Sequence, residues 1–171
     1  KAATSFGIDD DAYGKALFVT YTCSLVLAYP LGVITDRWHP MRTAFVAVTL
    51  YAVVMLLGYL FIGGKTSFWW FWIAHGVLSG TYFTTSAGLM LHLLPKDRFS
   101  EYNSAAAVLG SIGAITVSLG IGLVLDNSGN DYRTCFLMAG VLSGLAACGW
   151  FFLYRRFKAL GGPKGYVAPA A

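Results

Sequence analysis

The chain has 171 residues, of which 57% are hydrophobic and only 12% carry a charged side chain. A soluble globular domain averages about 25% charged residues, so this composition excludes a soluble domain and indicates an integral membrane protein. The net charge is +4, but the basic residues are spread over short loops and one end of the chain. That distribution is typical of membrane topology and does not favour nucleic-acid binding.

Residues 1–12 form a polar, acidic lead-in that we expect to lie outside the cytoplasm. Lys1 is soon followed by the run Asp9 to Asp11, whereas a secretory signal peptide has a basic start and then an apolar run. The segment does not have the pattern of a signal peptide. A chain that starts in this way is expected to be part of something longer.

Five apolar stretches follow, and each is long enough for a spanning helix, which needs about 20 predominantly apolar residues. None shows the period-two alternation of a barrel strand, so helices are the expected way to satisfy the backbone in lipid. The predicted spans are residues 13–35, 41–62, 67–94, 101–125 and 132–157. The expected fold class is therefore an all-α membrane protein, a bundle of five transmembrane helices.

Helix-ending residues support these boundaries. Pro40 stands directly before the second span, Gly63 and Gly64 end it, and Pro95 ends the third. Residues 159–171 are short, rich in Gly and Pro, and predicted to form a disordered cytoplasmic tail.

The distribution of basic residues predicts the orientation of the bundle. Eight Lys and Arg residues fall on the side of the 36–42 loop and four on the other side, and the side with more basic residues is expected to be cytoplasmic. The aromatic run 68–72 is interpreted as an anchor at the outer interface, and a platform for a ligand is the alternative. We therefore expect a multi-pass protein of the bacterial inner membrane whose C-terminus is cytoplasmic.

The loop after the first span carries the most informative motif of the chain, GVITDRWHPMR at residues 32–42. The carboxylate of Asp36, at a helix end, can face the amide-rich N-terminus of another helix. Arg37 and Arg42 can pair with carboxylates or with lipid phosphates. An ordinary cytoplasmic loop, which needs only basic residues, is the alternative interpretation.

This loop resembles the cytoplasmic loop G-x-L-A-D-R-x-G-R-(K/R)-x of the major facilitator superfamily of solute carriers. Gly32, Asp36 and Arg37 keep the Gly-Asp-Arg skeleton of that pattern. The positions that depart from the pattern are His39, where it has its second Gly, and Pro40 and Met41, where it has basic residues.

The resemblance covers residues 12–158. Residues 13–37 resemble the second helix of the C-terminal half of such a carrier, and residues 92–126 resemble its penultimate helix with a terminal Gly-x-x-x-Asp. Residues 136–156 resemble the last helix and its basic exit. The five spans would then be the eighth to twelfth helices of a twelve-helix carrier, and the first seven are absent from this chain.

The resemblance implies a secondary transporter that moves a small polar solute by alternating access around a site at mid-membrane. It also implies that Gly32, Asp36, Arg37 and Arg42 form a gating loop, with the partner of Asp36 in the opposite half. Since a lone half cannot perform alternating access, the missing N-terminal half is an expected partner, beside the lipid bilayer and the solute.

Polar side chains inside the predicted spans are the candidates for lining a solute site. An ionisable residue such as His75 is costly within a membrane and indicates function, and Tyr82 and Thr85 follow it on the same helix. Tyr21 and Ser24 give the first span a similar patch. His75 and the aromatic and hydroxyl residues after it resemble sugar- and nucleoside-proton symporters. Hydrogen bonds from helix to helix are the alternative role for all of these residues.

Small residues spaced four apart allow helices to approach closely in lipid. The glycines predicted to serve this packing are Gly76, Gly80, Gly110, Gly113, Gly122, Gly140 and Gly144.

A second hypothesis is a half-carrier that is retained as a non-transporting structural subunit of a larger membrane complex. In that case His75 or His92 would ligate a pigment or simply pack; otherwise no cofactor is expected. The three cysteines lie in apolar stretches without metal-ligand spacing, so no metal site is predicted. No nucleophile motif of a soluble enzyme is present, and an enzyme is not expected.

Overall fold

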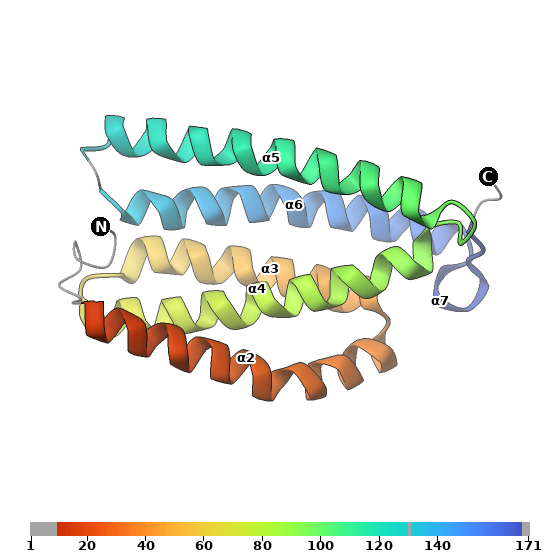
Figure 1. The fold of residues 1–171 in the computed structure, drawn as a ribbon, viewed down its shortest axis with the longest axis horizontal. Coiled ribbons are helices and arrows are strands. Elements are labelled where there is room, and N and C mark those ends of the chain that lie inside the picture. The colour runs from red at the N-terminus through yellow and green to blue at the C-terminus, as the bar shows by residue number, and fades with distance from the viewer. Residues whose placement is uncertain (1–9, 130, 169–171) are drawn as a thin grey trace.

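The structure, a computed structural model, describes residues 10–129 and 131–168, without the side chains of Asp10, Ala87, Leu91 and His92. In these residues five long helices run up and down along one axis, and a short helix follows them (Figure 1). Their bounds are α2 (Asp10–Trp38), α3 (Pro40–Phe61), α4 (Lys65–Leu93), α5 (Phe99–Asn127), α6 (Arg133–Ala159) and α7 (Gly162–Gly165). The predicted all-α fold is confirmed, and most of the lead-in lies outside the described residues.

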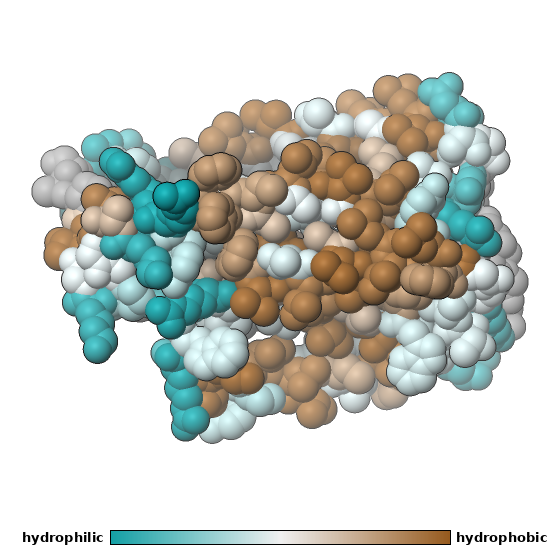
Figure 2. Space-filling view, turned by 180° about the vertical axis from the view of Figure 1, so that it is seen from behind, coloured by the Kyte–Doolittle hydropathy of each residue, from teal (hydrophilic) through white to brown (hydrophobic). Residues whose placement is uncertain are grey.

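Four of the long helices, α2, α3, α5 and α6, are long and apolar enough to cross a membrane. The fifth, α4, is as long as α5 at 29 residues, but its Trp, Tyr, His, Ser and Thr side chains lower its hydropathy. The predicted count of five spans is therefore approximate. An apolar band crosses the middle of the bundle between hydrophilic ends, as an integral membrane protein requires (Figure 2).

The centre of the bundle is α3. It packs on both α4 and α6, while α2 packs mainly on α4. Its buried positions include small residues such as Ala44, Ala47 and Ala52, which allow its neighbours to come close. Larger buried side chains gather near the two ends of the bundle, around Phe68 at one end and around Met41 at the other.

Helix α5 stands apart from this core. It packs on α6, and none of its described residues is buried. At its start, bidentate hydrogen bonds of 2.8 and 2.6 Å from Arg98 to the Glu101 carboxylate raise the pKa of the guanidinium. The apolar surface of α5 must be kept from water. Either lipid or another protein segment therefore covers it.

The tail differs from the expected disordered segment. Residues 162–165 form α7, and the backbone turns back through Gly161 and Gly162, whose φ angles are 105° and 59°. The hydroxyl of Tyr166 then donates to the Leu93 carbonyl at 3.1 Å, and its ring lies 5.3 Å from that of Phe157. Glycines that tolerate positive φ and one anchoring aromatic residue explain why this tail is folded.

Candidate functional site

Most of the predicted gating loop, residues 32–42, lies within two helices. Asp36 and Arg37 belong to the last turn of α2, Arg42 belongs to the first turn of α3, and His39 is the connection between the helices. His39 has φ 79° and caps α3, since its Nδ1 accepts a hydrogen bond from the Met41 amide at 3.3 Å. Positive φ at this residue explains the glycine at the equivalent place in the resembled pattern.

Two further contacts fix the loop against α6. The ring of His39 lies 5.0 Å from the ring of Phe157, and Arg42 donates through Nε to the Tyr154 hydroxyl at 2.8 Å. Within the described chain, no ion pair joins Asp36 to another residue. Its carboxylate is exposed at the end of the bundle, where a group from outside this chain can reach it.

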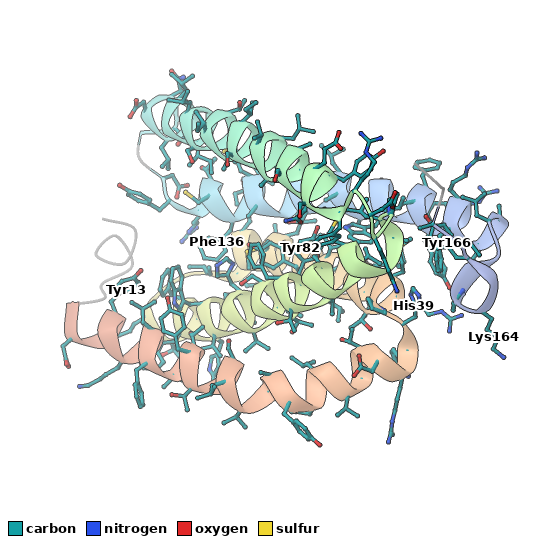
Figure 3. The ribbon with its side chains drawn as sticks, turned by 45° about the vertical axis from the view of Figure 1, so that its right-hand side comes forward. Tyr13, His39, Tyr82, Phe136, Lys164 and Tyr166 are labelled. Carbon is teal, nitrogen blue, oxygen red and sulfur yellow. The ribbon has the colours of Figure 1, made fainter. Side chains whose placement is uncertain are left out.

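A cleft runs between α4 and α6 over α3. It consists of two adjoining cavities of about 280 and 200 Å³ that share Tyr51 as a lining residue. Tyr82 lines the larger cavity and His75 the smaller one. The structure thus brings two of the five predicted lining residues to one cleft, and Figure 3 shows Tyr82 and Phe136, another lining residue, directed into this space.

The polar contact at the centre of the cleft joins α3 to α4. The Tyr51 hydroxyl and Nδ1 of His75 are 2.8 Å apart, so they share a hydrogen bond. The His75 ring lies 5.6 Å from the ring of Trp72. A pigment held by His75 would have to use Nε2, because Nδ1 is engaged; the side chain of His92 lies outside the described part.

Tyr82 forms the second polar contact across the cleft. Its hydroxyl accepts a hydrogen bond from Nε1 of Trp150 on α6 at 3.3 Å, and the two rings meet edge to face at 6.1 Å. Tyr51 and Trp150 are therefore functional candidates that sequence reasoning missed. An aromatic residue with one polar atom inside an apolar span was the available signal, but Tyr and Trp are common at membrane interfaces as well.

The other three lining candidates lie elsewhere. Tyr21 is exposed on α2, and Ser24 faces Gly80 at the contact of α2 with α4. Thr85 is buried and donates to the Thr81 carbonyl at 3.0 Å within its own helix. They do not reach the cleft of His75 and Tyr82.

The predicted packing glycines fall into two groups. Three lie against another helix, since a Cβ added to Gly76, Gly80 or Gly140 would meet Thr20, Ser24 or Leu56 respectively. Gly58, which the sequence analysis did not select, packs against Phe136 in the same way. The glycines with open space around an added Cβ are Gly110, Gly113, Gly122 and Gly144.

Neither the loop between α2 and α3 nor the cleft between α4 and α6 brings metal-ligating side chains together in the described residues. In the residues that the structure describes, no group of three or more His, Cys, Asp or Glu side chains is close enough to hold a metal ion. The residues that line the cleft offer aromatic faces and a few hydrogen-bonding groups to a ligand.

Comparison with known proteins gives one match. The family model described as Major Facilitator Superfamily matches residues 1–168, which include all the helices described above. The searches of curated proteins and of solved structures found no match.

Proposed function

The chain belongs to the major facilitator superfamily, and we propose that it is the C-terminal part of a secondary transporter that moves a small polar solute across a membrane. The match over residues 1–168 carries this proposal. The Gly-Asp-Arg skeleton at the end of α2 supports the assignment to the C-terminal half, together with the resemblance of residues 92–126 and 136–156 to the last two helices of such a carrier. The partner of the chain is then an N-terminal half with which it encloses a site at mid-membrane.

The solute is an uncharged, hydroxyl-rich molecule such as a sugar or a nucleoside. The cavity that Tyr82 lines also contains Ser79 and Ser143, whose hydroxyls suit a polar but neutral ligand. His75 would sense or relay a proton if transport is a symport, because the described parts of the spans place no carboxylate in this cleft. Tyr21, which is exposed on α2, is proposed for the side of the site that faces the other half, whereas Ser24 and Thr85 are held in contacts within this chain.

The loop from Gly32 to Arg42 would gate the cytoplasmic entrance. The exposed carboxylate of Asp36 would contact the opposite half in one state of the transporter and release it in the other. This arrangement puts the C-terminus in the cytoplasm of a bacterial cell, in accord with the excess of Lys and Arg at this end of the bundle.

The test is uptake of radiolabelled sugars and nucleosides into proteoliposomes that contain this chain together with its partner half. The double variant His75→Ala/Tyr82→Ala is expected to lose at least about tenfold in uptake, since removing two hydrogen-bonding groups costs more than about 1.4 kcal/mol. Tyr29→Leu, at an exposed position of α2, is the control. Unchanged uptake in the double variant would refute the site, and no uptake of any solute would refute transport.

A further inference from the structure

A cavity of about 550 Å³ lies where the loop between α2 and α3 meets the tail. It is separate from the cleft of His75 and Tyr82, which lies between α4 and α6. The residues that shape it include Asp36, Arg37, Trp38, Arg42, Pro163 and Lys164. Two segments more than a hundred residues apart in the sequence therefore enclose one space.

The fold of the tail determines where Lys164 lies. The turn at Gly161 is tight, because a Cβ added there would come within 2.5 Å of the Gly165 backbone. Beyond α7, Tyr166 is fixed to the end of α4 by its hydrogen bond to the Leu93 carbonyl. Figure 3 shows Lys164, Tyr166 and His39 together at this end of the bundle. The tail thus holds a cation beside the loop.

The charges around the cavity are unbalanced. Arg37, Arg42 and Lys164 contribute three positive charges and Asp36 one negative charge, which leaves an excess of two. Among the described residues no ion pair links Asp36 to any of the three. An anion that enters this cavity is attracted by the excess positive charge.

The donors that face the cavity are side chains. Arg42 uses Nε for Tyr154, and its two terminal nitrogens donate no hydrogen bond to the residues that the structure describes. The first backbone amides of α3 are already bonded, since those of Arg42 and Thr43 both donate to the His39 carbonyl. A guanidinium fork beside a lysine ammonium is the donor set that binds a tetrahedral phosphate oxyanion.

We propose that this cavity is a binding site for a phosphate group, either that of an anionic lipid headgroup or free inorganic phosphate. The bound phosphate bridges Arg37 and Arg42 of the loop to Lys164 of the tail. Because it neutralises the excess charge, it holds the tail against the loop. The site shares Asp36, Arg37 and Arg42 with the proposed gating loop. Phosphate binding is measured without transport, so its failure would leave the transport proposal unaffected.

The experiment uses the purified full chain in nanodiscs and two probes. The first is radiolabelled inorganic phosphate, measured by equilibrium dialysis against nanodiscs of phosphatidylcholine alone. The second is phosphatidylglycerol, supplied in nanodiscs with equal parts of phosphatidylcholine and counted on the chain by native mass spectrometry. Saturable dialysis binding identifies free phosphate as the ligand, and retained phosphatidylglycerol without dialysis binding identifies the lipid.

Three variants decide whether the cavity is the site. Lys164→Gln is expected to weaken binding about tenfold, the effect of losing one charge-assisted hydrogen bond, and its exposed side chain makes misfolding no concern. Asp36→Asn is expected to tighten binding several-fold by removing the only carboxylate of the lining. Arg133→Gln, which removes an exposed charge at the opposite end, is the control. Non-saturable binding of both probes, or equal losses in Lys164→Gln and Arg133→Gln, would overturn the proposal.

Discussion

At the scale of single residues, the most unusual backbone belongs to His39. Its φ of 79° is the only positive value among the described non-glycine residues, and a non-glycine residue held there costs about 1–3 kcal/mol. His39 recovers part of this cost by capping α3 and by packing on Phe157. His39 departs from the family pattern at this position, and these two contacts are what the histidine supplies in place of glycine.

The strained φ and the two contacts of His39 predict which of two variants at position 39 is the more stable. His39→Ala keeps the strained φ and loses both contacts, so it is expected to lower the free energy of unfolding by about 1–3 kcal/mol. His39→Gly loses the same contacts but removes the strain, so its stability should exceed that of the alanine variant by about 1 kcal/mol. Unfolding of both variants in mixed micelles by titration with SDS measures the difference. Equal stability of the two would mean that the backbone is not strained.

Gly76 offers a second test, at the contact of α2 with α4. A Cβ added there would lie 2.0 Å from the Thr20 methyl carbon, and overpacking of this kind costs about 1–3 kcal/mol. Gly76→Ala should therefore lower the midpoint of thermal unfolding, and adding Thr20→Ser should restore it, because serine keeps the hydroxyl bonded to the Ala16 carbonyl and lacks the methyl group.

The control for this pair is Gly110→Ala on α5, where an added Cβ has open space. This change should leave the midpoint unchanged or raise it slightly, since alanine favours a helix. A midpoint that falls as far in Gly110→Ala as in Gly76→Ala would contradict the contact.

At the scale of helices, the sequence predicted where the long helices lie along the chain. It did not predict which face of each helix packs against its neighbours. The five long helices lie where the apolar stretches lie, because a helix that spans lipid needs about 20 such residues. The aromatic run 68–72 was interpreted as a single interfacial anchor, but Phe68 is buried in the core while Trp70 is 70% exposed. Which face of α4 meets α3 depends on its neighbours, because the apolar and polar side chains of α4 are spread around the helix and form no apolar stripe.

The candidate site shows the same limit. His75 and Tyr82 are seven residues apart, which puts them on one face of α4, and the sequence selected both. Their partners Tyr51 and Trp150 come from α3 and α6, and no local pattern reveals which helices become neighbours. Tyr21 and Ser24 were selected by the same reasoning about polar residues but lie on α2, away from this cleft.

The bond between Tyr51 and His75 is expected to hold α3 and α4 together. A double-mutant cycle with Tyr51→Phe and His75→Phe keeps two rings and removes the hydrogen bond, and a coupling energy of about 0.5–2 kcal/mol is expected inside a membrane. SDS titration of the two single variants and the double variant supplies the four free energies. Tyr59→Phe in place of Tyr51→Phe is the control, and a coupling no larger than that of this control would show that the bond contributes nothing.

At the scale of the whole molecule, the helices of the described chain differ in how far they are covered by their neighbours. Helix α3 packs on both α4 and α6, whereas α5 has no buried residue in the part described and the glycines Gly110 and Gly113 have open space around them. Small residues on a spanning helix favour close contact with another helix. The proposed N-terminal half, which a transporter of this superfamily needs for alternating access, is the partner that this surface fits.

We therefore expect the surface of α5 to be less accessible to a chemical label in the native membrane than in the isolated chain. A cysteine at Ile112, which is 56% exposed on α5, should react with a lipid-soluble maleimide about tenfold more slowly in membranes of the native host than in the purified chain. That factor corresponds to about 1.4 kcal/mol of added protection. A cysteine at Leu60, exposed near the end of α3, is expected to react alike in both preparations. Equal rates for the Ile112 cysteine in the two preparations would mean that lipid alone covers α5, and the chain would then lack the partner that transport requires.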